Sequence, residues 1–449
     1  MTRTNRFSGR LARTGATFLR PGGRRSSAIT TLTTGLVLLL NALSGAILAR
    51  VLLPAGRGQF AAITVAPPLI TFLMSMGCGS AVTYHHARFP RSGGSLIATW
   101  ALILIPLSII AVIVCEVYAR TVVAAYGTPT ATIASFYALT IPLGGYSSLF
   151  VGIGVGAGDY GFYNAIRIAQ SALPVAIFIA LGVTGTLGIA SATGSYAGVL
   201  ALVSAAWLVR VLRRFGIGRP SLSLARSSFV YGLKSHGANI GSTVNLRLDQ
   251  FILPLVVAAS SLGLYAVAVS ASAVVTSLSS AVAVVVLPTA ARHPERAVAI
   301  ARRALAVTLL SAILLAAALA LVSPLALHIV YGPHYGGGAN ALRLLLPGAV
   351  ALAAATVVGQ ALLAVNRPLD WTFSQLAAAV LTVVGLSLVA VLHVGIAGAA
   401  VVSSLSYGAT LAVALCLFLR ATRSGFPAFI VGHTLGVAGD AHDESAGRG

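Results

Sequence analysis

One apolar stretch of the sequence, residues 229–258, carries several polar side chains. Five of them follow one another at spacings of 3, 4, 4 and 3 residues: His236, Asn239, Thr243, Arg247 and Gln250. On an α-helix these spacings place all five on one face. A guanidinium in such a stripe stays charged in a partly dry site, and its planar fork matches phosphate oxygens. We therefore take the five as candidate substrate-binding residues, with Arg247 expected to attract a diphosphate.

Three more polar residues of this stretch, Lys234, Asn245 and Asp249, lie on a second, roughly opposite face. Arg247 and Asp249 are two residues apart, so their side chains point in different directions and are not expected simply to neutralise each other. Lys234 is expected near an entrance to the site, either binding substrate or reaching the membrane surface from a helix end. Asp249 is the candidate for energy coupling. The alternative is that Arg247 and Asp249 only hold the helix to its neighbours through hydrogen bonds.

A milder polar stripe lies in the first apolar stretch, at Thr34, Asn41 and Ser44. We expect it to face the stretch 229–258 across a cavity, which makes Asn41 a further candidate substrate-binding residue. Hydrogen bonding inside a helical core explains the stripe equally well.

Composition indicates which elements must position these side chains. Of the 449 residues, 57% are hydrophobic and 8% are charged, and the mean hydropathy is +0.94. About 25% of the residues of an average soluble protein are charged, so a soluble enzyme is excluded. The chain is predicted to be an all-α polytopic membrane protein, because stretches of about 20 apolar residues can span a membrane as helices. Twelve such stretches occur, at 28–52, 59–84, 96–118, 131–156, 162–184, 187–209, 229–258, 262–290, 301–331, 340–365, 371–393 and 396–420.

The placement of charge predicts the orientation. The chain has 29 basic and 8 acidic residues, a net charge of +21. With the N-terminus inside, 24 of the basic residues fall in cytoplasmic segments and 4 in outside connections. This asymmetry predicts a multi-pass protein of the cytoplasmic (inner) membrane with both termini in the cytoplasm. Topology therefore explains the basic character, and no nucleic acid is expected as a partner.

The two halves of the chain repeat each other. The segment GRGQFAAITVA parallels SLGLYAVAVSA, which aligns Gly58 with Gly263 at a shift of 205 residues, and Gln170 matches Gln375 at the same shift. A repeat of six spans preserves orientation, so we expect two pseudo-symmetric six-helix lobes around a central cavity. The expected order is a disordered basic cytoplasmic tail, an N-terminal lobe, a basic cytoplasmic linker, a C-terminal lobe and a cytoplasmic tail, at 1–27, 28–209, 210–228, 229–420 and 421–449.

Several segments resemble a known family. LARVLLPAGRGQFA, with GCGSAVTYH after it, is similar to the opening of polysaccharide-export flippases. LRLDQFILP followed by SLGLYAVA is similar to the start of their second half, and VGIAGAAVVSSLSY to their last helix. The family is the polysaccharide transporter (oligosaccharide flippase, O-antigen flippase-like) family of the multidrug/oligosaccharidyl-lipid/polysaccharide exporter superfamily, and the resemblance covers about residues 28–420. One departure is Arg57, where the family usually has an uncharged, often aromatic residue.

The resemblance implies a secondary-active flippase that exports a polyprenyl-diphosphate-linked saccharide by alternating access, for cell-surface polysaccharide biosynthesis. It implies membrane lipids as partners, together with glycosyltransferases and a polymerase of the same pathway. The runner-up is a drug or cation antiporter of the same superfamily, for which Asp249 and Asp159 are the available carboxylates.

An integral-membrane glycosyl-transfer enzyme is the least favoured interpretation. The single lysine, Lys234, lies in VYGLKSH without the glycine spacing of a nucleotide-binding loop, so direct driving by ATP is not expected. The acidic residues are too few for a metal or glycosidase centre. Neither a cofactor, a metal nor catalysis is therefore expected.

Overall fold

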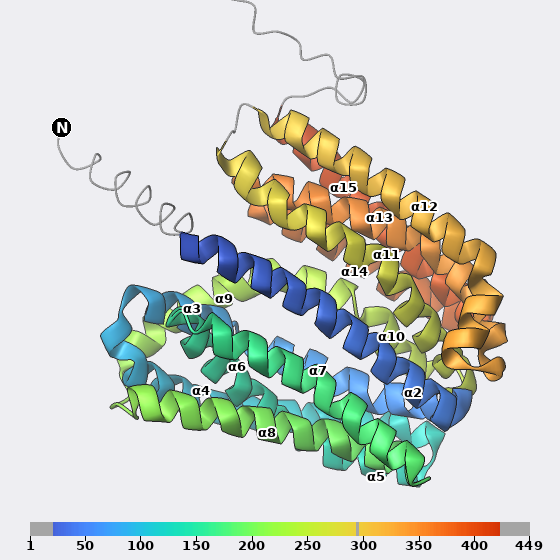
Figure 1. Cartoon of the computed structure of the whole chain (residues 1–449), viewed down its shortest axis with the longest axis horizontal. Coiled ribbons are helices and arrows are strands. Elements are labelled where there is room, and N and C mark those ends of the chain that lie inside the picture. The colour runs from blue at the N-terminus through green and yellow to red at the C-terminus, as the bar shows by residue number, and fades with distance from the viewer. Residues whose placement is uncertain (1–20, 293–295, 423–449) are drawn as a thin grey trace, which may run out of the picture.

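The computed structural model describes residues 21–292 and 296–422, and every regular element within them is helical (Figure 1). Of the predicted tails, residues 1–20 and 423–449 lie outside the described residues. The expectation of disorder is wrong for residues 21–27, which form the start of helix α2. The first half of the chain folds into α2 (Pro21–Met74), α3 (Cys78–Arg88), α4 (Gly93–Thr121), α5 (Thr128–Ala138), α6 (Ile141–Gly156), α7 (Tyr160–Val183) and α8 (Ile189–Phe215). The second half folds into α9 (Leu222–Asn245), α10 (Leu248–Ile252), α11 (Ala259–Arg292), α12 (Ala297–Tyr331), α13 (Ala339–Ala364), α14 (Pro368–Leu392) and α15 (Gly395–Ala421).

The number of membrane-crossing helices agrees with the twelve predicted stretches. Ten helices of the described part are long and apolar enough to cross a membrane. One of the ten runs through α2, which is two helices joined at Leu53 (φ 59°, ψ 172°). Pro54 explains the join, because proline disfavours helical geometry in the residue before it and has no N–H to donate. The twelfth span is α9, whose polar residues keep it out of the ten.

The basic segment between the halves is shorter than predicted. Helix α8 continues to Phe215 and α9 begins at Leu222, so six residues rather than 210–228 connect them. Arginine is a good helix former, and cations near the last turn of a helix interact favourably with its dipole. The connection contains Gly216, which has a left-handed φ of 64°, and it ends at Ser221, whose hydroxyl accepts a hydrogen bond from the N–H of Leu224 at 3.4 Å.

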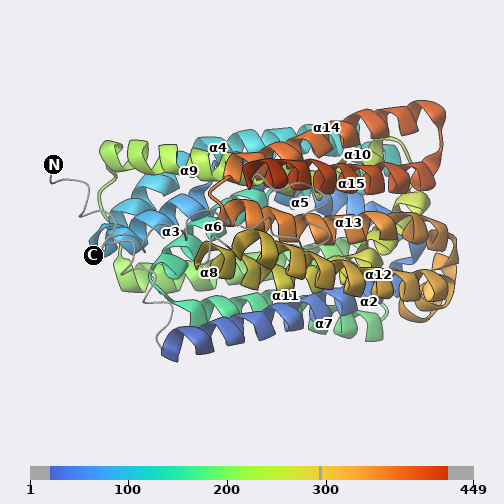
Figure 2. The ribbon, with the colours of Figure 1, turned by 90° about the horizontal axis from the view of Figure 1, so that it is seen from above.

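The helices form two groups, with α2 running between them (Figure 1) and most of the helix axes aligned along the length of the molecule (Figure 2). The two groups of helices are joined and filled by three large clusters of buried apolar residues. One cluster draws on both halves, for example Ala62 with Leu262 and Leu342. The other two each stay within one group, around Trp100 and around Phe418. The lobes therefore share a core at one end of the molecule and have separate cores towards the other.

Helix α9 is attached to both groups. In its first half, Ser228 accepts a hydrogen bond from the indole N–H of Trp100 in α4 at 3.0 Å, and the ring of Tyr231 stacks on Tyr84 of α3 at 4.2 Å. Near its end, the Asn245 side chain donates to Gln375 Oε1 of α14 at 2.9 Å. The helix that carries most of the candidate site residues is thus also a bridge between the lobes.

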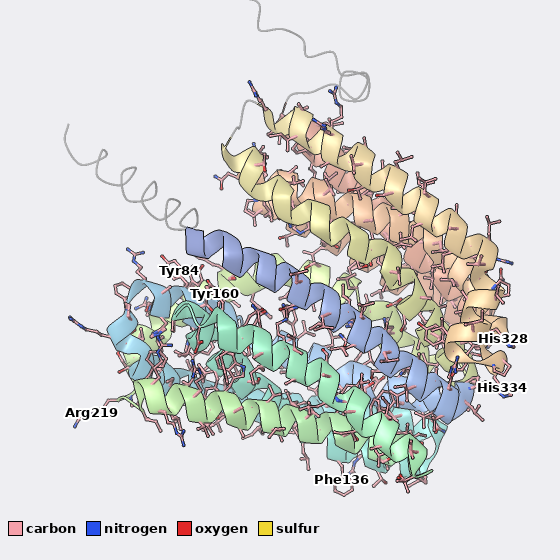
Figure 3. The ribbon with its side chains drawn as sticks, in the orientation of Figure 1. Tyr84, Phe136, Tyr160, Arg219, His328 and His334 are labelled. Atoms are coloured by element: carbon pink, nitrogen blue, oxygen red, sulfur yellow. The ribbon has the colours of Figure 1, made fainter. Side chains whose placement is uncertain are left out.

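Large apolar side chains cover much of the outside of the molecule. On α12, Leu310, Leu314 and Leu321 are 64%, 62% and 81% exposed. Exposing such an apolar surface to water costs free energy, whereas exposing it to lipid does not. The surface therefore agrees with a multi-pass membrane protein. The labelled aromatic and basic side chains sit at the two ends of the bundle, with Tyr84, Tyr160 and Arg219 at one end and Phe136, His328 and His334 at the other (Figure 3). Such residues favour the two membrane–water interfaces.

Candidate functional site

At one end of the molecule the backbones of α2 and α11 touch, and we call this contact the glycine crossing. A Cβ on Gly58 would lie 1.8 Å from the carbonyl oxygen of Ala259, and a Cβ on Gly263 would lie 1.9 Å from that of Pro54. No larger residue fits at either position without moving a helix. Each residue pair of the contact is related to the other by the same shift of 205 residues. The repeated segment of each lobe therefore packs against its counterpart about a pseudo-two-fold axis.

Hydrogen bonds between the lobes surround the glycine crossing. The Tyr126 hydroxyl of the N-terminal lobe donates to the carbonyl oxygen of Val257 at 2.8 Å. From the other lobe, the Tyr335 hydroxyl donates to the carbonyl oxygen of Ala49 at 3.0 Å. Arg50 Nε donates to the carbonyl oxygen of Val330 at 3.0 Å. Because these bonds join both lobes, we call this end of the molecule the closed end.

Arg57 lies next to the glycine crossing. Its Nε is buried and has no hydrogen-bond partner among the described residues, and its guanidinium lies 5.5 Å from the centroid of the Phe60 ring. Tyr196 of one lobe and Tyr331 and Tyr335 of the other are close enough to interact with its charge. A buried cation with an unpaired donor costs free energy. Arg57, the position at which this chain differs from the family it resembles, is therefore buried where the two lobes meet.

The predicted polar face of residues 236–250 is interrupted. Helix α9 ends at Asn245, and Arg247 (φ −127°, ψ −12°) is the N-cap residue before the short helix α10. The expectation of one continuous helical face is therefore wrong, because residues beyond 245 no longer follow the 3.6-residue period of α9. Arg247 is exposed, and its guanidinium makes no hydrogen bond or ion pair with the part of the chain that the structure describes. Within residues 236–250, Arg247 is therefore a cation whose N–H donors are available to a ligand.

The other members of the predicted stripe do not share one environment. His236 is buried against α2, where Nε2 lies 3.2 Å from the carbonyl oxygen of Leu73 and the ring lies 4.7 Å from that of Phe72. Asn239 is exposed and donates to the carbonyl oxygen of Ser235 in its own helix. The remaining two, Thr243 and Gln250, are half-buried.

Asp249 lies in the core of the C-terminal lobe, with a relative exposure of 2%. Its Oδ2 accepts hydrogen bonds from the hydroxyls of Tyr265 at 2.6 Å and Ser403 at 3.3 Å. Its Oδ1 accepts a hydrogen bond from the N–H of Gln250 at 2.8 Å. The carboxyl group is thus fully engaged by three donors, one of them on the distant helix α15.

Asn245, on the same side as Asp249, anchors a second buried network. Its amide donates to Gln375 Oε1 at 2.9 Å, and its carbonyl oxygen accepts from the Ser406 hydroxyl at 3.1 Å. Ser406 in turn accepts from Thr382 at 2.7 Å. The repeat match of Gln375 was the available sequence signal for this network, although it did not reveal the partners. Lys234, the third member of the predicted second face, is exposed.

The polar stripe of the first span faces its own lobe. The Ser44 hydroxyl lies 3.0 Å from that of Tyr196 in α8, and Arg167 of α7 donates to Thr34 at 3.2 Å. The expectation that these two residues face α9 is therefore wrong, since tertiary packing turns them towards α7 and α8. Asn41 is exposed. In the described residues, no group of three His, Cys, Asp or Glu side chains could hold a metal ion.

This arrangement defines a class of protein, the two-lobed helical membrane proteins. The lipid II flippase MurJ in an inward closed conformation superposes with a TM-score of 0.73 at 13% identity, covering 89% of this chain and 88% of that one. An inward-facing multidrug resistance MATE family transporter of the MOP superfamily superposes with a TM-score of 0.68 at 15% identity, covering 86% and 94%. At these identities the likeness concerns the fold, a bundle of twelve helices in two lobes.

The family follows from the sequence itself. The model of a family described as polysaccharide biosynthesis protein matches residues 47–340. The chain belongs to this family. No curated protein matches the sequence. The expected relationship to a polysaccharide family is thereby confirmed.

Proposed function

We propose that this protein flips a polyprenyl-diphosphate-linked saccharide from the inner to the outer leaflet of the cytoplasmic membrane by alternating access, for cell-surface polysaccharide biosynthesis. Membership of a polysaccharide biosynthesis family and the two-lobed transporter fold support this proposal. The observation that carries it is the exposed, unpaired guanidinium of Arg247 at the break between α9 and α10. The available N–H donors of Arg247 can bind the oxygens of a diphosphate. The described carboxylates nearby already have hydrogen-bond or ion-pair partners within the protein.

The closed end would be the outer side of the membrane. The distribution of basic residues supports this orientation, because the end of α8 and the connection after it carry Arg210, Arg213, Arg214 and Arg219, and α3 ends at Arg88. Both termini would then be cytoplasmic. The lobes share a core only at the closed end, which corresponds to a state that admits substrate from the cytoplasmic side.

Within this cycle each predicted residue has a proposed role. Arg247 would bind the diphosphate, with Gln250 and Thr243 beside it. Asn239, Lys234 and Asn41, which are exposed, would contact the head group on its way in. His236 would act through its packing on α2. Asp249 would couple transport to an ion gradient or to the membrane potential, since its two side-chain donors lie on different helices of the lobe, α11 and α15.

The drug or cation antiporter is the second candidate, and the MATE-like fold favours it. A cationic drug needs an accessible carboxylate. Asp249 is buried behind three donors, and Asp159 pairs with Arg210 at 2.6 Å. These contacts favour an anionic substrate over a cationic one. The relatives are transporters and flippases rather than enzymes, and we propose the same for this chain.

The test uses purified full-length protein in vesicles that contain a fluorescent polyprenyl-diphosphate saccharide and lack ATP. Flipping is measured by quenching the label from outside. Arg247→Ala should abolish flipping at a normal yield of folded protein, and Arg247→Lys should recover only part of it because an ammonium lacks the planar fork. Arg420→Ala, which removes another exposed guanidinium of the same lobe, should flip normally.

Two outcomes would contradict the proposal. Full flipping by a stable Arg247→Ala protein would remove this residue from the mechanism. Export of cationic drugs by the wild-type protein, without flipping of the lipid-linked saccharide, would favour the antiporter.

A further inference from the structure

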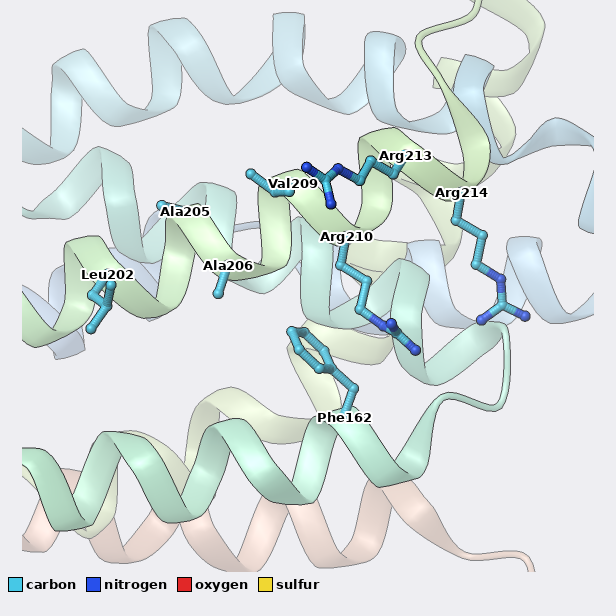
Figure 4. Close-up of a pocket in the computed structure, with 8 residues that line it drawn as sticks. All are labelled: Phe162, Leu202, Ala205, Ala206, Val209, Arg210, Arg213 and Arg214. Atoms are coloured by element: carbon cyan, nitrogen blue, oxygen red, sulfur yellow. The ribbon is translucent and has the colours of Figure 1, made fainter.

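A groove lies on the outside of the N-terminal lobe, between α7 and α8 (Figure 4). It has a volume of about 820 Å³. Most of its wall is apolar, and three arginines close one end. The lining residues are Phe162 of α7 and Leu202, Ala205, Ala206, Val209, Arg210, Arg213 and Arg214 of α8.

The sequence of α8 explains this shape. Residues at spacings of 3 and 4 share one face of a helix, and the face that runs through 202, 206, 209 and 213 changes from apolar to basic along its length. Alanines at 205 and 206 leave space beside the ring of Phe162. Leu202 and Val209 are 58% and 47% exposed although both are apolar. This part of the surface therefore suits hydrocarbon rather than water.

The arginines carry a surplus of positive charge. Asp159 is the one acidic partner found among the described residues, and its Oδ2 lies 2.6 Å from Arg210 Nε and 3.6 Å from an Nη of Arg214. The hydrogen bond from Arg210 lowers the pKa of Asp159, so this carboxylate stays charged at neutral pH. Arg213 is exposed and has neither a hydrogen bond nor an ion pair within the described ranges. Three cations share one anion, which leaves donors available for another.

We infer that this groove binds an anionic phospholipid of the cytoplasmic leaflet. One acyl chain lies along Leu202, Ala206 and Val209, and the phosphate contacts Arg213 and the outward donors of Arg210. The apolar wall and the cations occur in the order in which a lipid presents its chain and its head group. Basic pockets between membrane helices on the cytoplasmic side are typical sites for anionic lipids. A soluble anion would use the arginines and leave the apolar wall empty.

Native mass spectrometry of the full-length protein in detergent tests this inference. The probes are phosphatidylglycerol, phosphatidylcholine with the same chains, and glycerol 3-phosphate. Phosphatidylglycerol should bind at least tenfold more tightly than phosphatidylcholine. Arg213→Gln should weaken its binding by about tenfold, the expected effect of losing one charge-assisted hydrogen bond. The matched control is Arg219→Gln, an exposed arginine outside the groove that should bind like wild type.

A second variant tests the apolar wall without changing charge. Ala205→Phe fills the groove beside Phe162 and should weaken phosphatidylglycerol binding by a similar factor. Equal binding of both lipids, or equal effects of the substitutions at Arg213 and Arg219, would overturn the inference. Glycerol 3-phosphate that binds as tightly as the lipid would overturn it too, since the site would then recognise a free phosphate. None of these outcomes depends on which substrate the protein transports.

Discussion

Replacing Gly58 by alanine should prevent the closed end from closing. The added Cβ would lie 1.8 Å from the carbonyl oxygen of Ala259, about 1.6 Å short of an ordinary contact. The Cβ is held rigidly by the backbone of α2 and the atoms it meets are backbone, so no flexible side chain can move aside and the helices themselves must separate. Overpacking of this kind costs about 1–3 kcal/mol. That cost lowers the population of the closed state by roughly 5- to 150-fold.

The pseudo-symmetry of the contact supplies an internal check. Gly263→Ala makes the reciprocal clash, 1.9 Å from the carbonyl oxygen of Pro54, and should have the same effect. The double variant should be less harmful than the sum of the two, because the first methyl group already separates the helices. Gly45→Ala is the matched control in α2, before the join at Leu53, since nothing lies within 4 Å of its added Cβ. It should be neutral or stabilising by about 0.5–1 kcal/mol.

The assay is a distance between the lobes, measured by electron paramagnetic resonance with spin labels at Ala125 and His334. Both residues are exposed, on opposite lobes at the closed end. The Gly58 and Gly263 variants should show a longer distance and lose flipping, while Gly45→Ala should match wild type in both. A stably folded Gly58→Ala protein with the wild-type distance and full transport would refute the reasoning.

Three further substitutions test the polar contacts. Tyr265→Phe removes the hydroxyl that donates to Asp249 and should lower the free energy of unfolding in detergent by about 1–3 kcal/mol; no change would show that this bond contributes nothing. Asn245→Leu leaves Gln375 without its donor and should lower the thermal midpoint, and an unchanged midpoint would contradict the network. The lowered pKa of Asp159 stabilises the fold above its unfolded value of about 3.9, and this stabilisation is lost as pH falls through the folded pKa. Asp159→Asn should therefore lack that acid-dependent step in the thermal midpoint, whereas an identical acid profile would show that the ion pair is not involved.

The fold was predictable because lipid imposes a simple rule on the chain. Spans must be long and apolar, and each backbone group must be paired within a helix. Even the end of the first predicted stretch at residue 52 coincides with the join at Leu53, where proline follows. The predicted start of α9, at residue 229, is seven residues later than its observed start at Leu222. Its first turns contain three serines and Arg226, like a linker, and they are held by tertiary contacts such as that of Ser228 with Trp100.

The site was less predictable, because periodicity assumes an unbroken helix. Residues 244–250 read VNLRLDQ and contain neither proline nor glycine to indicate a break. The interruption accompanies contacts that are remote in sequence: Asp249 reaches Tyr265 and Ser403, and it also accepts from the N–H of Gln250. Such a competition between local helix and buried hydrogen bonds depends on partners that a single stretch of sequence does not identify.

Helix α9 constrains how the lobes can move. Its first half is bonded to the N-terminal lobe through Ser228, and its end is bonded to the C-terminal lobe through Asn245. Rigid rocking of the lobes would break one of these buried contacts, at about 1–3 kcal/mol for each polar group left unpaired. A bend within α9 avoids that cost, and Gly237 lies between the two contacts with nothing within 4 Å of its added Cβ. Opening at the glycine crossing would break the interlobe hydrogen bonds of Tyr126, Tyr335 and Arg50 and separate the shared apolar core. A cycle that opens the closed end must therefore replace these contacts, while α9 keeps the lobes joined and carries Arg247 just beyond its end.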